Sequence, residues 1–580
     1  MCRSHLIRGC CVLLIALALT QCTPAPDGPG GRAADGGLLL PDGFDAVVVV
    51  DSIGPARHLA VRENGDIYAM LKRSYADGTV VALRDTTGDG RADIVRKFGA
   101  LENEGGWYTG AEIRGDYLYV STSLRIYRYQ LTPGRLVPEA PPDTVLLDDH
   151  EHGVHEHISK PMAFDEAGHL YVPFGAPTNA CQEPKRTPGV PGQDPCPDLD
   201  AHGGIWRFEA GAINQTQADG DEFASGIRSA VAIDWNPVDD NLYVVVHGRD
   251  NLHRLWPNTF TRWENAMLPA EEFIRVTEGA HFGWPYCYYD QLQGQKVLAP
   301  EYGGDGDTVG RCSQFDDPLI GFPGHFAPND LLFYRGDHFP ERYANGAFIA
   351  LHGSTIRNPY PQAGYFVAFV PFADGAPAGA WEVFANGFAG VDPIVNTSDA
   401  KHRPGGLAMG PEGALYITED NRGTIWRVTF TGDKDAFGAA QLARMEQEKR
   451  TASNIRTPDP EADNLQREEL LAGGKLYNTY CAACHQQDGL GAPPRYPPLV
   501  GTEWVTGDKQ RLISVIINGL EGPIEVNGEP YNNAMPQHSF LSDQEVAEVA
   551  TYIRQNLGND ASAITAEEVQ AVRGAAPAED

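Results

Sequence analysis

Gly413-Ala414-Leu415-Tyr416-Ile417 holds the pattern that decides the fold: a turn residue followed by a short run of large apolar side chains. Such a run after a turn predicts a hairpin that leads into a half-buried strand. The other copies of this signature are Gly65-Asp66-Ile67-Tyr68, Asp116-Tyr117-Leu118-Tyr119-Val120, Gly168-His169-Leu170-Tyr171-Val172, Asn241-Leu242-Tyr243-Val244 and Asp330-Leu331-Leu332-Phe333-Tyr334. Six copies predict an all-β six-bladed propeller, in which radial repetition protects the strand edges; a β-sandwich of hairpins is the alternative.

Cys481-Ala482-Ala483-Cys484-His485 carries the most specific chemistry in the chain. Two thiols three positions apart can form thioether bonds to both vinyl groups of a haem, and the adjacent histidine becomes the proximal iron ligand. Met535 lies just before a helical segment and offers a thioether to the other side of the iron. The predicted haem c ligands are Cys481, Cys484, His485 and Met535. A chance CxxCH beside a core methionine is the alternative.

The chain of 580 residues is too long for one core, so several domains are expected. Residues 41–430 form the propeller, and residues 431–464 form a linker in which Thr457-Pro458-Asp459-Pro460 follows a charged helical stretch. A small all-α cytochrome c domain is predicted over residues 465–558. Residues 559–580 are expected to be a disordered acidic tail.

The N-terminus resembles an export signal. Arg3 and Arg8 precede an apolar run that is too short to span a bilayer but has the length of a signal h-region. Residues 1–22 therefore predict a lipoprotein-type signal in which Cys22 becomes the lipid anchor, followed by a flexible linker over residues 23–40; cleavage and release is the alternative. The expected location is the periplasm or the cell surface, anchored to a bacterial membrane. The net charge of −33 argues against a nucleic-acid partner.

Four cysteines remain once signal, anchor and haem are assigned: Cys181, Cys196, Cys287 and Cys312. In an oxidising compartment these predict two disulfides, most simply Cys181–Cys196 and Cys287–Cys312, each closing a loop rich in Pro or Gly. Zinc ligation is the weaker alternative because no pair has CxxC spacing.

Polar residues concentrate in loops of the predicted propeller. His157 ends the loop that begins at Asp148, immediately before a strand, where a histidine can act as a general base near neutral pH. A solvated loop or a metal site is the alternative there, because His150, His152 and His155 are closely spaced with it. Further loops carry Arg228, Arg249 and Arg403. Surface ion pairs would explain each arginine singly, whereas their convergence would make an anionic cofactor site.

In their order along the chain, these segments resemble the PQQ-dependent soluble aldose dehydrogenases, most closely the L-sorbosone dehydrogenase-like proteins, here followed by cytochrome c. The resemblance covers residues from about 55 to 430. It is carried by His157, Phe164 to Val172, Asn179-Ala-Cys-Gln-Glu183, Pro195-Cys-Pro197, Ala224-Ser-Gly-Ile-Arg228, His247-Gly-Arg-Asp250, Phe282-Gly-Trp-Pro285, Ala327-Pro-Asn-Asp330 and Leu351-His-Gly-Ser354.

The resemblance implies a role for each matched position. His157 matches the base that takes the substrate hydroxyl proton while hydride passes to PQQ, and Arg228 matches the guanidinium that pairs with the quinone oxygen. Gly248 and Arg249 match the positions whose backbone carbonyls hold Ca²⁺. The positions expected to contact the PQQ carboxylates are His325, Arg357 and Arg403.

The chain departs from that family at several positions. Ala176 stands where the sugar dehydrogenases carry an acid that orients the base, so Glu156 or another residue is expected to take over that task. Ser229 replaces an amide side chain. Separately, the segment from Asp85 to Asp93 has the carboxylate spacing of a small calcium loop, with a plain Asp/Gly turn as the alternative.

The predicted protein is a quinohaemoprotein dehydrogenase that oxidises a sugar or an aldehyde with PQQ and Ca²⁺. Electrons then leave through the covalent haem c to an external acceptor, a cytochrome or a quinone-linked chain. Two alternatives remain. One is a non-enzymatic propeller that binds a glycan or partner and carries an electron-transfer haem, and the other is a Ca²⁺-dependent, lactonase-like hydrolase.

Overall fold

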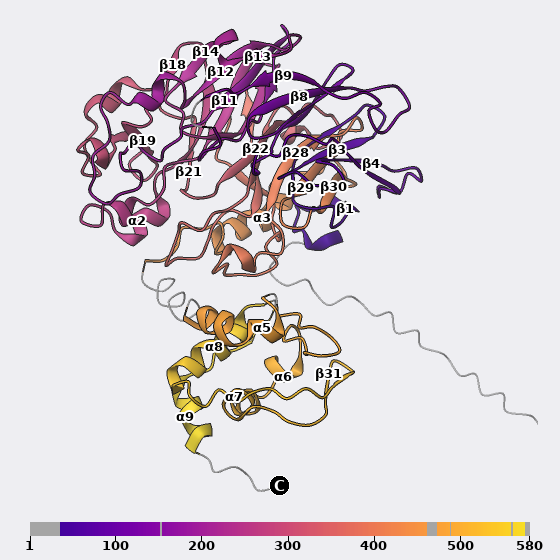
Figure 1. The fold of residues 1–580 in the computed structure, drawn as a ribbon, viewed down its shortest axis with the longest axis vertical. Coiled ribbons are helices and arrows are strands. Elements are labelled where there is room, and N and C mark those ends of the chain that lie inside the picture. The colour runs from indigo at the N-terminus through magenta and orange to yellow at the C-terminus, as the bar shows by residue number, and fades with distance from the viewer. Residues whose placement is uncertain are drawn as a thin grey trace, which may run out of the picture.

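The computed structural model describes residues 35–150, 153–460, 472–487, 489–557, 559 and 561–574. Figure 1 shows a large β-rich part built from residues up to about 460 and a smaller helical part near the C-terminus. The predicted fold class, a six-bladed propeller followed by a small helical cytochrome c domain, is confirmed. The signal over residues 1–22, its Cys22 and most of the following linker lie outside the described residues.

Each of the six blades is an antiparallel sheet with four principal strands. The first blade contains β2 (Ala56–Val61), β3 (Ile67–Leu71), β4 (Val80–Arg84) and β5 (Ile94–Phe98). The second contains β6 (Ala111–Arg114), β7 (Tyr117–Ser121), β8 (Arg125–Gln130) and β9 (Asp143–Leu147), and β13 (Gln215–Thr216) extends it. The third contains β10 (Ala163–Phe164), β11 (His169–Phe174), β12 (Gly204–Glu209) and β14 (Asp221–Ser225), and β18 (Ala280–His281) extends it. The fourth blade contains β15 (Ala230–Asn236), β16 (Asn241–Val246), β17 (Glu271–Val276) and β21 (Ile320–Phe322). The fifth contains β22 (Pro328–Phe333), β23 (Ala347–Leu351), β24 (Phe366–Val370) and β27 (Glu382–Ala385). The sixth contains β28 (Pro404–Met409), β29 (Leu415–Glu419), β30 (Ile425–Phe430) and β1 (Phe44–Val50).

The ring is closed by its first strand. β1 pairs antiparallel with β30, so that Phe44 lies opposite Phe430 and the N-terminal strand completes the last blade. Leu38 and Leu40, just before this strand, are already buried in the same core as Trp426. The expected linker over residues 23–40 was therefore drawn too long, because its last residues belong to the propeller.

The repeated strand signature is buried on both faces rather than half-buried. In β3, Ile67, Ala69 and Leu71 pack into one inter-blade core, whereas Tyr68 and Met70 pack into the next one. A strand that lies between two neighbouring blades meets apolar side chains on each side, so both sets of alternate positions must be apolar. This explains why the signature is a continuous apolar run.

One copy of the signature lies on a different strand of its blade from the other five. Five copies fall on second strands, namely β3, β7, β11, β16 and β29, but Asp330 to Tyr334 falls on β22, the first strand of its blade. First strands of neighbouring blades contact one another around the axis. The true counterpart is β23, whose five residues are all buried.

Residues 431–464 are not merely a linker. Helix α3 (Ala439–Thr451) packs on the fifth blade beside β27, and Met445, Ala452 and Ile455 are buried in the core that contains Phe366. The Lys449 ammonium lies 3.6 Å from the centroid of the Trp381 ring. The described chain therefore stays attached to the propeller until about residue 460, because Met445 in the helix, the residues just after it and the contact of Pro460 with Tyr360 hold it there.

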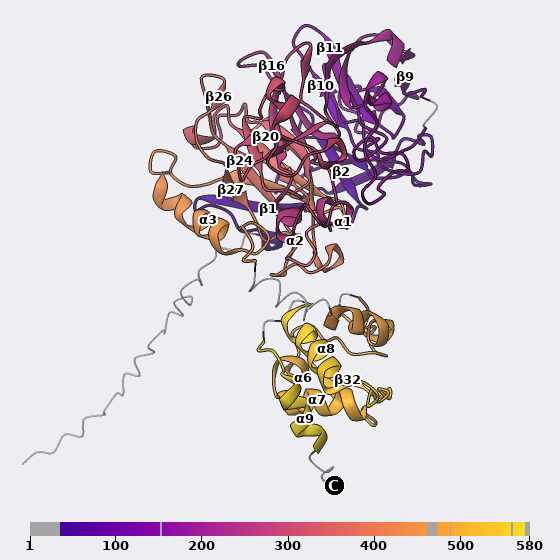
Figure 2. The ribbon, with the colours of Figure 1, turned by 90° about the vertical axis from the view of Figure 1, so that its left-hand side faces the viewer.

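The C-terminal domain is mainly helical (Figure 2). Its elements are a helix over residues 472–480, α5 (Ala482–His485), α6 (Glu503–Thr506), α7 (Lys509–Asn518), α8 (Asp543–Gln555), α9 (Ala566–Gly574) and a hairpin of β31 (Ile524–Val526) and β32 (Glu529–Tyr531). Within the described part of the chain, none of the helices combines the length and hydrophobicity that a bilayer span requires.

The prediction of a disordered tail over residues 559–580 was wrong for most of that segment. Ile564 and Val569 are buried with Ile513 and Ala550, so α9 completes the core of the cytochrome domain. Thr565 and Glu568 exchange hydrogen bonds at the start of this helix. That capping box, Thr-x-x-Glu, is a helix-start signal that the acidic composition of the segment concealed.

Candidate functional site

His157 lies in the turn before β10 with a left-handed backbone conformation, φ 58°. Its Nδ1 lies 2.7 Å from the carbonyl oxygen of Ala176 and must carry the proton to donate there, which leaves the lone pair on Nε2. A Cβ atom on Gly175 would come 2.1 Å from the His157 carbonyl oxygen, so only glycine permits this approach. The orienting acceptor is therefore the backbone of residue 176.

Burial and the charge of Arg228 hold the pKa of His157 well below its ordinary value. The ring is therefore neutral at physiological pH, as a general base must be. Glu156, the residue expected to orient the base, instead forms an ion pair of 2.6 Å with Arg186. Of the two options, Glu156 or another residue, the second holds: Glu156 lies on the exposed side of the turn, and the backbone carbonyl of Ala176 makes the Nδ1 contact.

Arg228 is buried and its guanidinium is held by three oxygen acceptors. It donates to the carbonyl of Gly248 at 2.7 Å, to Asn179 Oδ1 at 2.9 Å and to Asp250 Oδ2 at 2.9 Å. Its Nε is buried without a hydrogen-bond partner in the described part of the chain. Its backbone carbonyl accepts from the Ala176 amide at 2.8 Å, which joins Arg228 to the residue that holds His157.

Asp250 is the carboxylate that forms ion pairs with both Arg228 and Arg186. Burial opposes its ionisation, but the charges of Arg228 and Arg186 prevail and lower the pKa of Asp250. The carboxylate lies 2.9 Å from Arg228 and 3.0 Å from Arg186. Because both ion pairs share Asp250, it fixes the position of the Arg228 guanidinium relative to the His157 loop.

Gly248 and Arg249 follow β16. The amide of Gly248 donates to Glu271 at 2.8 Å, and burial raises the pKa of Glu271 to about 7. The guanidinium of Arg249 is ion-paired with Glu301 and buried, so the Arg249 side chain points away from any ligand. Only the backbone carbonyls of the two residues could hold a cation, and the Gly248 carbonyl already accepts from Arg228. A Ca²⁺ site there stays a prediction.

His325 and Arg357 lie on loops beside this pair. His325 Nε2 lies 2.7 Å from the Asn265 carbonyl, and burial lowers the pKa of His325 below its ordinary value, so its ring is neutral at physiological pH. Arg357 is 1% exposed and donates to Met267 Sδ at 3.5 Å. Arg357 adds a positive charge close to His325. The contacts of both residues with the PQQ carboxylates stay predictions.

A second cationic cluster surrounds Asp420. This buried carboxylate lies 2.7 Å from His352 Nε2, 2.9 Å from Lys72 Nζ and 3.4 Å from Arg57 Nε. Arg403 donates to the His352 carbonyl at 3.3 Å, and its guanidinium lies over the ring of Tyr365. The cluster holds more cations than anions, which suits a ligand with several carboxylates.

The two clusters adjoin one another. Arg57 and Arg228 both contribute to the lowered pKa of His247, after the larger effect of burial. His247 Nε2 lies 2.6 Å from the Pro328 carbonyl, near the axis. The positive charge of this region comes from Arg228, Arg403, Arg57 and Lys72, with Arg357 nearby, whereas His157 and His325 are neutral there. These residues fit an anionic cofactor such as PQQ.

Five residues that position or charge this region were not predicted as site residues: Asn179, Asp250, Lys72, Arg57 and Asp420. Only Asp250, in His247-Gly-Arg-Asp250, and Asn179, in Asn179-Ala-Cys, stand in segments that carry the family resemblance. Their partners lie 22 to 363 positions away in the chain. Local spacing carries no signal for contacts of that range.

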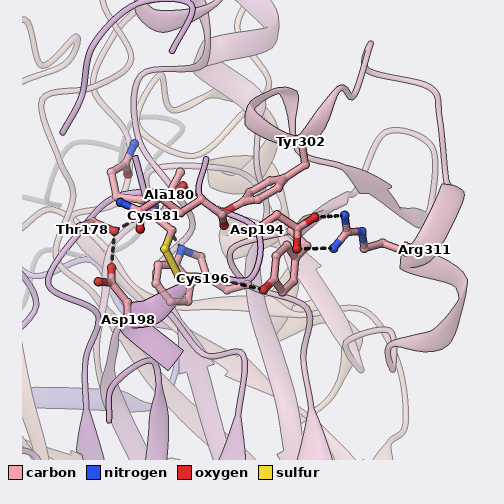
Figure 3. The surroundings of a disulfide bond; sticks show 12 residues. Thr178, Ala180, Cys181, Asp194, Cys196, Asp198, Tyr302 and Arg311 are labelled. Carbon is pink, nitrogen blue, oxygen red and sulfur yellow. Dashed lines mark hydrogen bonds and ion pairs between the residues drawn. A yellow bond between two sulfur atoms is a disulfide. The ribbon is translucent and has the colours of Figure 1, made fainter. Parts of the chain in front are cut away.

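Both predicted disulfides are present. Cys181 pairs with Cys196 and Cys287 with Cys312. Figure 3 shows the first, with Thr178 Oγ1 donating to Asp198 at 2.6 Å and accepting from the Cys181 amide at 2.7 Å. Trp284 Nε1 donates to the Asn179 carbonyl at 3.1 Å. The disulfide therefore secures the loop whose Asn179 side chain holds Arg228.

Replacing Cys181 and Cys196 with serine is expected to lower the free energy of unfolding of the propeller by about 3 kcal/mol. The bond spans 15 positions, and opening a loop of that length restores about this much chain entropy to the unfolded state. Urea unfolding followed by tryptophan fluorescence measures the change. Unfolding midpoints equal to those of the unaltered protein would contradict it.

The segment from Asp85 to Asp93 forms a self-contained turn. Asp85 accepts from the amides of Thr87, Gly88 and Gly90 at 2.7 to 2.9 Å, and Asp93 accepts from the Thr86 amide at 2.7 Å. The carboxylates are thus committed to backbone donors, which favours the plain-turn interpretation over the calcium loop.

The predicted haem ligands line one cavity in the C-terminal domain. It is lined by Cys481, Cys484, His485 and Met535 together with apolar side chains from α7 and α8. His485 Nδ1 lies 2.9 Å from the carbonyl of Pro497, which assigns the proton to Nδ1 and the lone pair to Nε2. Both cysteines are free thiols in the described structure. These residues fit a covalently attached haem with His and Met axial ligands.

Comparison with protein families matches residues 38–431 to the TrAA12-like family and residues 470–556 to cytochrome c. Two solved structures share the propeller fold. The pyranose dehydrogenase PQQ domain of Coprinopsis cinerea has a TM-score of 0.54 and 16% identity, covering 69% of this chain and 99% of that chain. The calcium structure of a Trichoderma reesei carbohydrate-active enzyme of family AA12 has a TM-score of 0.53 and 19% identity, covering 69% and 97%.

Among relatives, cytochrome c-552 of Thermus thermophilus is 41% identical over 111 residues, 17% of this chain and 83% of that protein. The cytochrome c subunit of the quinone alcohol dehydrogenase of Gluconobacter oxydans is 38% identical over 106 residues, 18% and 22%. An uncharacterized protein of Borreliella burgdorferi is 27% identical over 209 residues, which make up 36% of this chain. The chain spans about half of that protein, 48% of its length. The chain belongs to the TrAA12-like family and carries a cytochrome c domain after its propeller.

Proposed function

We propose that this protein is a quinohaemoprotein dehydrogenase that oxidises a sugar or an aldehyde. The carrying observation is His157, neutral and oriented by the Ala176 carbonyl, beside an Arg228 that is fixed by Asp250. A fused haem c domain gives the extracted electrons an outlet. The propeller neighbour described as a PQQ domain and the relative that is a dehydrogenase cytochrome subunit support the same class of reaction.

PQQ, when bound, supplies a two-electron acceptor for hydride. Arg228 would hold its quinone oxygens, and His325, Arg357 and Arg403 would hold its carboxylates. His157 Nε2 takes the proton of the substrate hydroxyl group, while Nδ1 stays bound to the Ala176 carbonyl and keeps the ring in place. The Gly248 and Arg249 carbonyls are the proposed ligands of Ca²⁺, a hard cation that prefers oxygen.

His485 and Met535 would bind the haem iron, and Cys481 and Cys484 would form thioether bonds to the vinyl groups of the haem. The electrons then leave for an external acceptor of the cytochrome or quinone-linked class. We place the protein in the periplasm or at the cell surface, anchored through Cys22. The two disulfides support an oxidising compartment, and cell fractionation tests the location.

The decisive experiment adds PQQ and Ca²⁺ to purified, haem-loaded protein and then supplies aldoses, sorbosone-like aldehydes and polyols in turn. Reduction of haem by one of these substrates, only after PQQ has been added, supports the dehydrogenase. Substrate binding without haem reduction would favour the non-enzymatic propeller. Lactone hydrolysis with Ca²⁺ alone would favour the hydrolase, and an unchanged haem spectrum with every substrate overturns the proposal.

The acid limb of kcat/KM is expected below pH 6.5. Because the pKa of His157 is lowered from its ordinary value of 6.5, the neutral base persists as pH falls through 6.5 and is lost only at lower pH. Substrate-dependent haem reduction measured from pH 4 to pH 8 checks this. A limb at or above pH 6.5 would show that His157 titrates as an ordinary histidine or that another group is the base.

A further inference from the structure

Three imidazole rings meet outside the site described above. His150 and His155 belong to the loop that leads to His157, whereas His202 follows the short 3-10 helix η2 (Pro197–Asp200). The centroid of the His202 ring lies 4.3 Å from that of His150 and 5.2 Å from that of His155. The fold therefore gathers nitrogen donors from two segments about fifty residues apart. His152, which was grouped with them in the sequence, lies outside the described residues.

Two of these rings are oriented by oxygen acceptors on Nδ1. Asp148 Oδ1 lies 2.6 Å from His150 Nδ1, and the other oxygen of Asp148 is paired with buried Lys160 at 2.8 Å. The Nδ1 of His155 is hydrogen-bonded to the Glu156 carbonyl. A proton on Nδ1 puts the lone pair of each ring on Nε2, and a carboxylate behind a ring is the usual support of a metal-ligating histidine.

His202 is the buried member of the group. It is 2% exposed, and the rings of His150 and His155 lie beside it. A metal ion would therefore be held between one buried ring and two rings that lie nearer the surface.

We propose that His150, His155 and His202 bind one divalent transition-metal ion of the Zn²⁺ class. Imidazole nitrogens suit such ions, and three histidines make a complete protein ligand set for zinc with a fourth position left to water. Ca²⁺, which prefers oxygen, would not compete there. The site is thus chemically distinct from the proposed Ca²⁺ site at Gly248.

The rings must turn toward one another to bind. Among the described residues, the only group of His, Cys, Asp and Glu side chains with ligand atoms all within 4.8 Å of one another is Cys181, Cys196 and Asp198, whose sulfurs form a disulfide. His155 is partly exposed and can turn more readily than the buried His202, and such a turn would exchange its hydrogen bond with the Glu156 carbonyl for the metal. Because His155 lies two residues before His157, metal binding would also fix the loop of the proposed base, a consequence that rests on the proposed function.

The test is calorimetric titration of Zn²⁺ into chelator-treated, haem-loaded protein in excess Ca²⁺, with zinc and iron counted by elemental analysis. One zinc per chain is expected, and His150→Gln or His202→Gln should weaken its binding at least tenfold. His150 is 18% exposed on its side chain, so its variant remains informative if the variant of the buried His202 fails to fold.

His169→Gln is the matched control, because His169 also has its Nδ1 held by an aspartate, Asp165 at 2.6 Å, but lies on β11. It should bind zinc like the unaltered protein. His157→Asn should also bind zinc normally, so the metal site can stand even if the proposed catalytic base fails. The absence of zinc in the unaltered protein, or equal binding by His150→Gln, overturns the proposal.

Discussion

His157→Asn is expected to lower the rate of substrate-dependent haem reduction by about 10² to 10⁴-fold, the usual contribution of a general base. The asparagine amide can still donate to the Ala176 carbonyl, the contact that positions residue 157. It cannot take a proton from a substrate hydroxyl group. PQQ binding should persist, because the cationic groups of Arg228, Arg357 and Arg403 are unchanged.

The measurement pairs stopped-flow haem reduction with equilibrium binding of PQQ. His253→Asn is the matched control: His253 also has Nδ1 against a backbone carbonyl, that of Phe260 at 2.7 Å, but serves the packing of a loop. The control should keep normal turnover. If His157→Asn turns over at the rate of this control, another group is the base; if it loses PQQ as well, His157 has a binding role instead.

The propeller could be predicted from the sequence because its information is local. A turn followed by an apolar run specifies a buried strand wherever it occurs, and repetition then specifies the ring. The segment from Asp330 to Tyr334 shows the limit of this local information. Both β22 and β23 carry buried apolar runs, so the pattern alone does not tell a first strand from a second one.

The site was less predictable because its contacts are long-range. His157 and Arg228 were identified through a resemblance, but the residues that position them were not: Ala176 acts through its backbone carbonyl, which no side chain reveals. Asp250 was read as part of a loop motif, yet it is the shared anion of two arginines. Such roles depend on which blade ends face one another, and that arrangement exists only in the folded ring.

Removing both cysteines that would attach the haem should separate oxidation of the substrate from electron transfer through the haem. In a Cys481→Ala, Cys484→Ala variant we expect no covalent haem, because the only described free thiols line this cavity. Substrate-dependent reduction of an external two-electron dye should continue, since no residue of the cationic site in the propeller is altered. A haem stain on the denatured protein and a dye assay measure the two outcomes.

The control for that variant is Met535→Leu, which keeps both cysteines and His485 but removes the thioether from the iron. It should retain covalent haem and show a lower reduction potential, because a methionine ligand raises the potential of c-type haem. If the double alanine variant loses dye reduction while its propeller still unfolds at the normal midpoint, oxidation of substrate depends on the haem itself. The electron path would then not begin at His157 and Arg228, and the haem domain could no longer be regarded as the outlet of a propeller reaction.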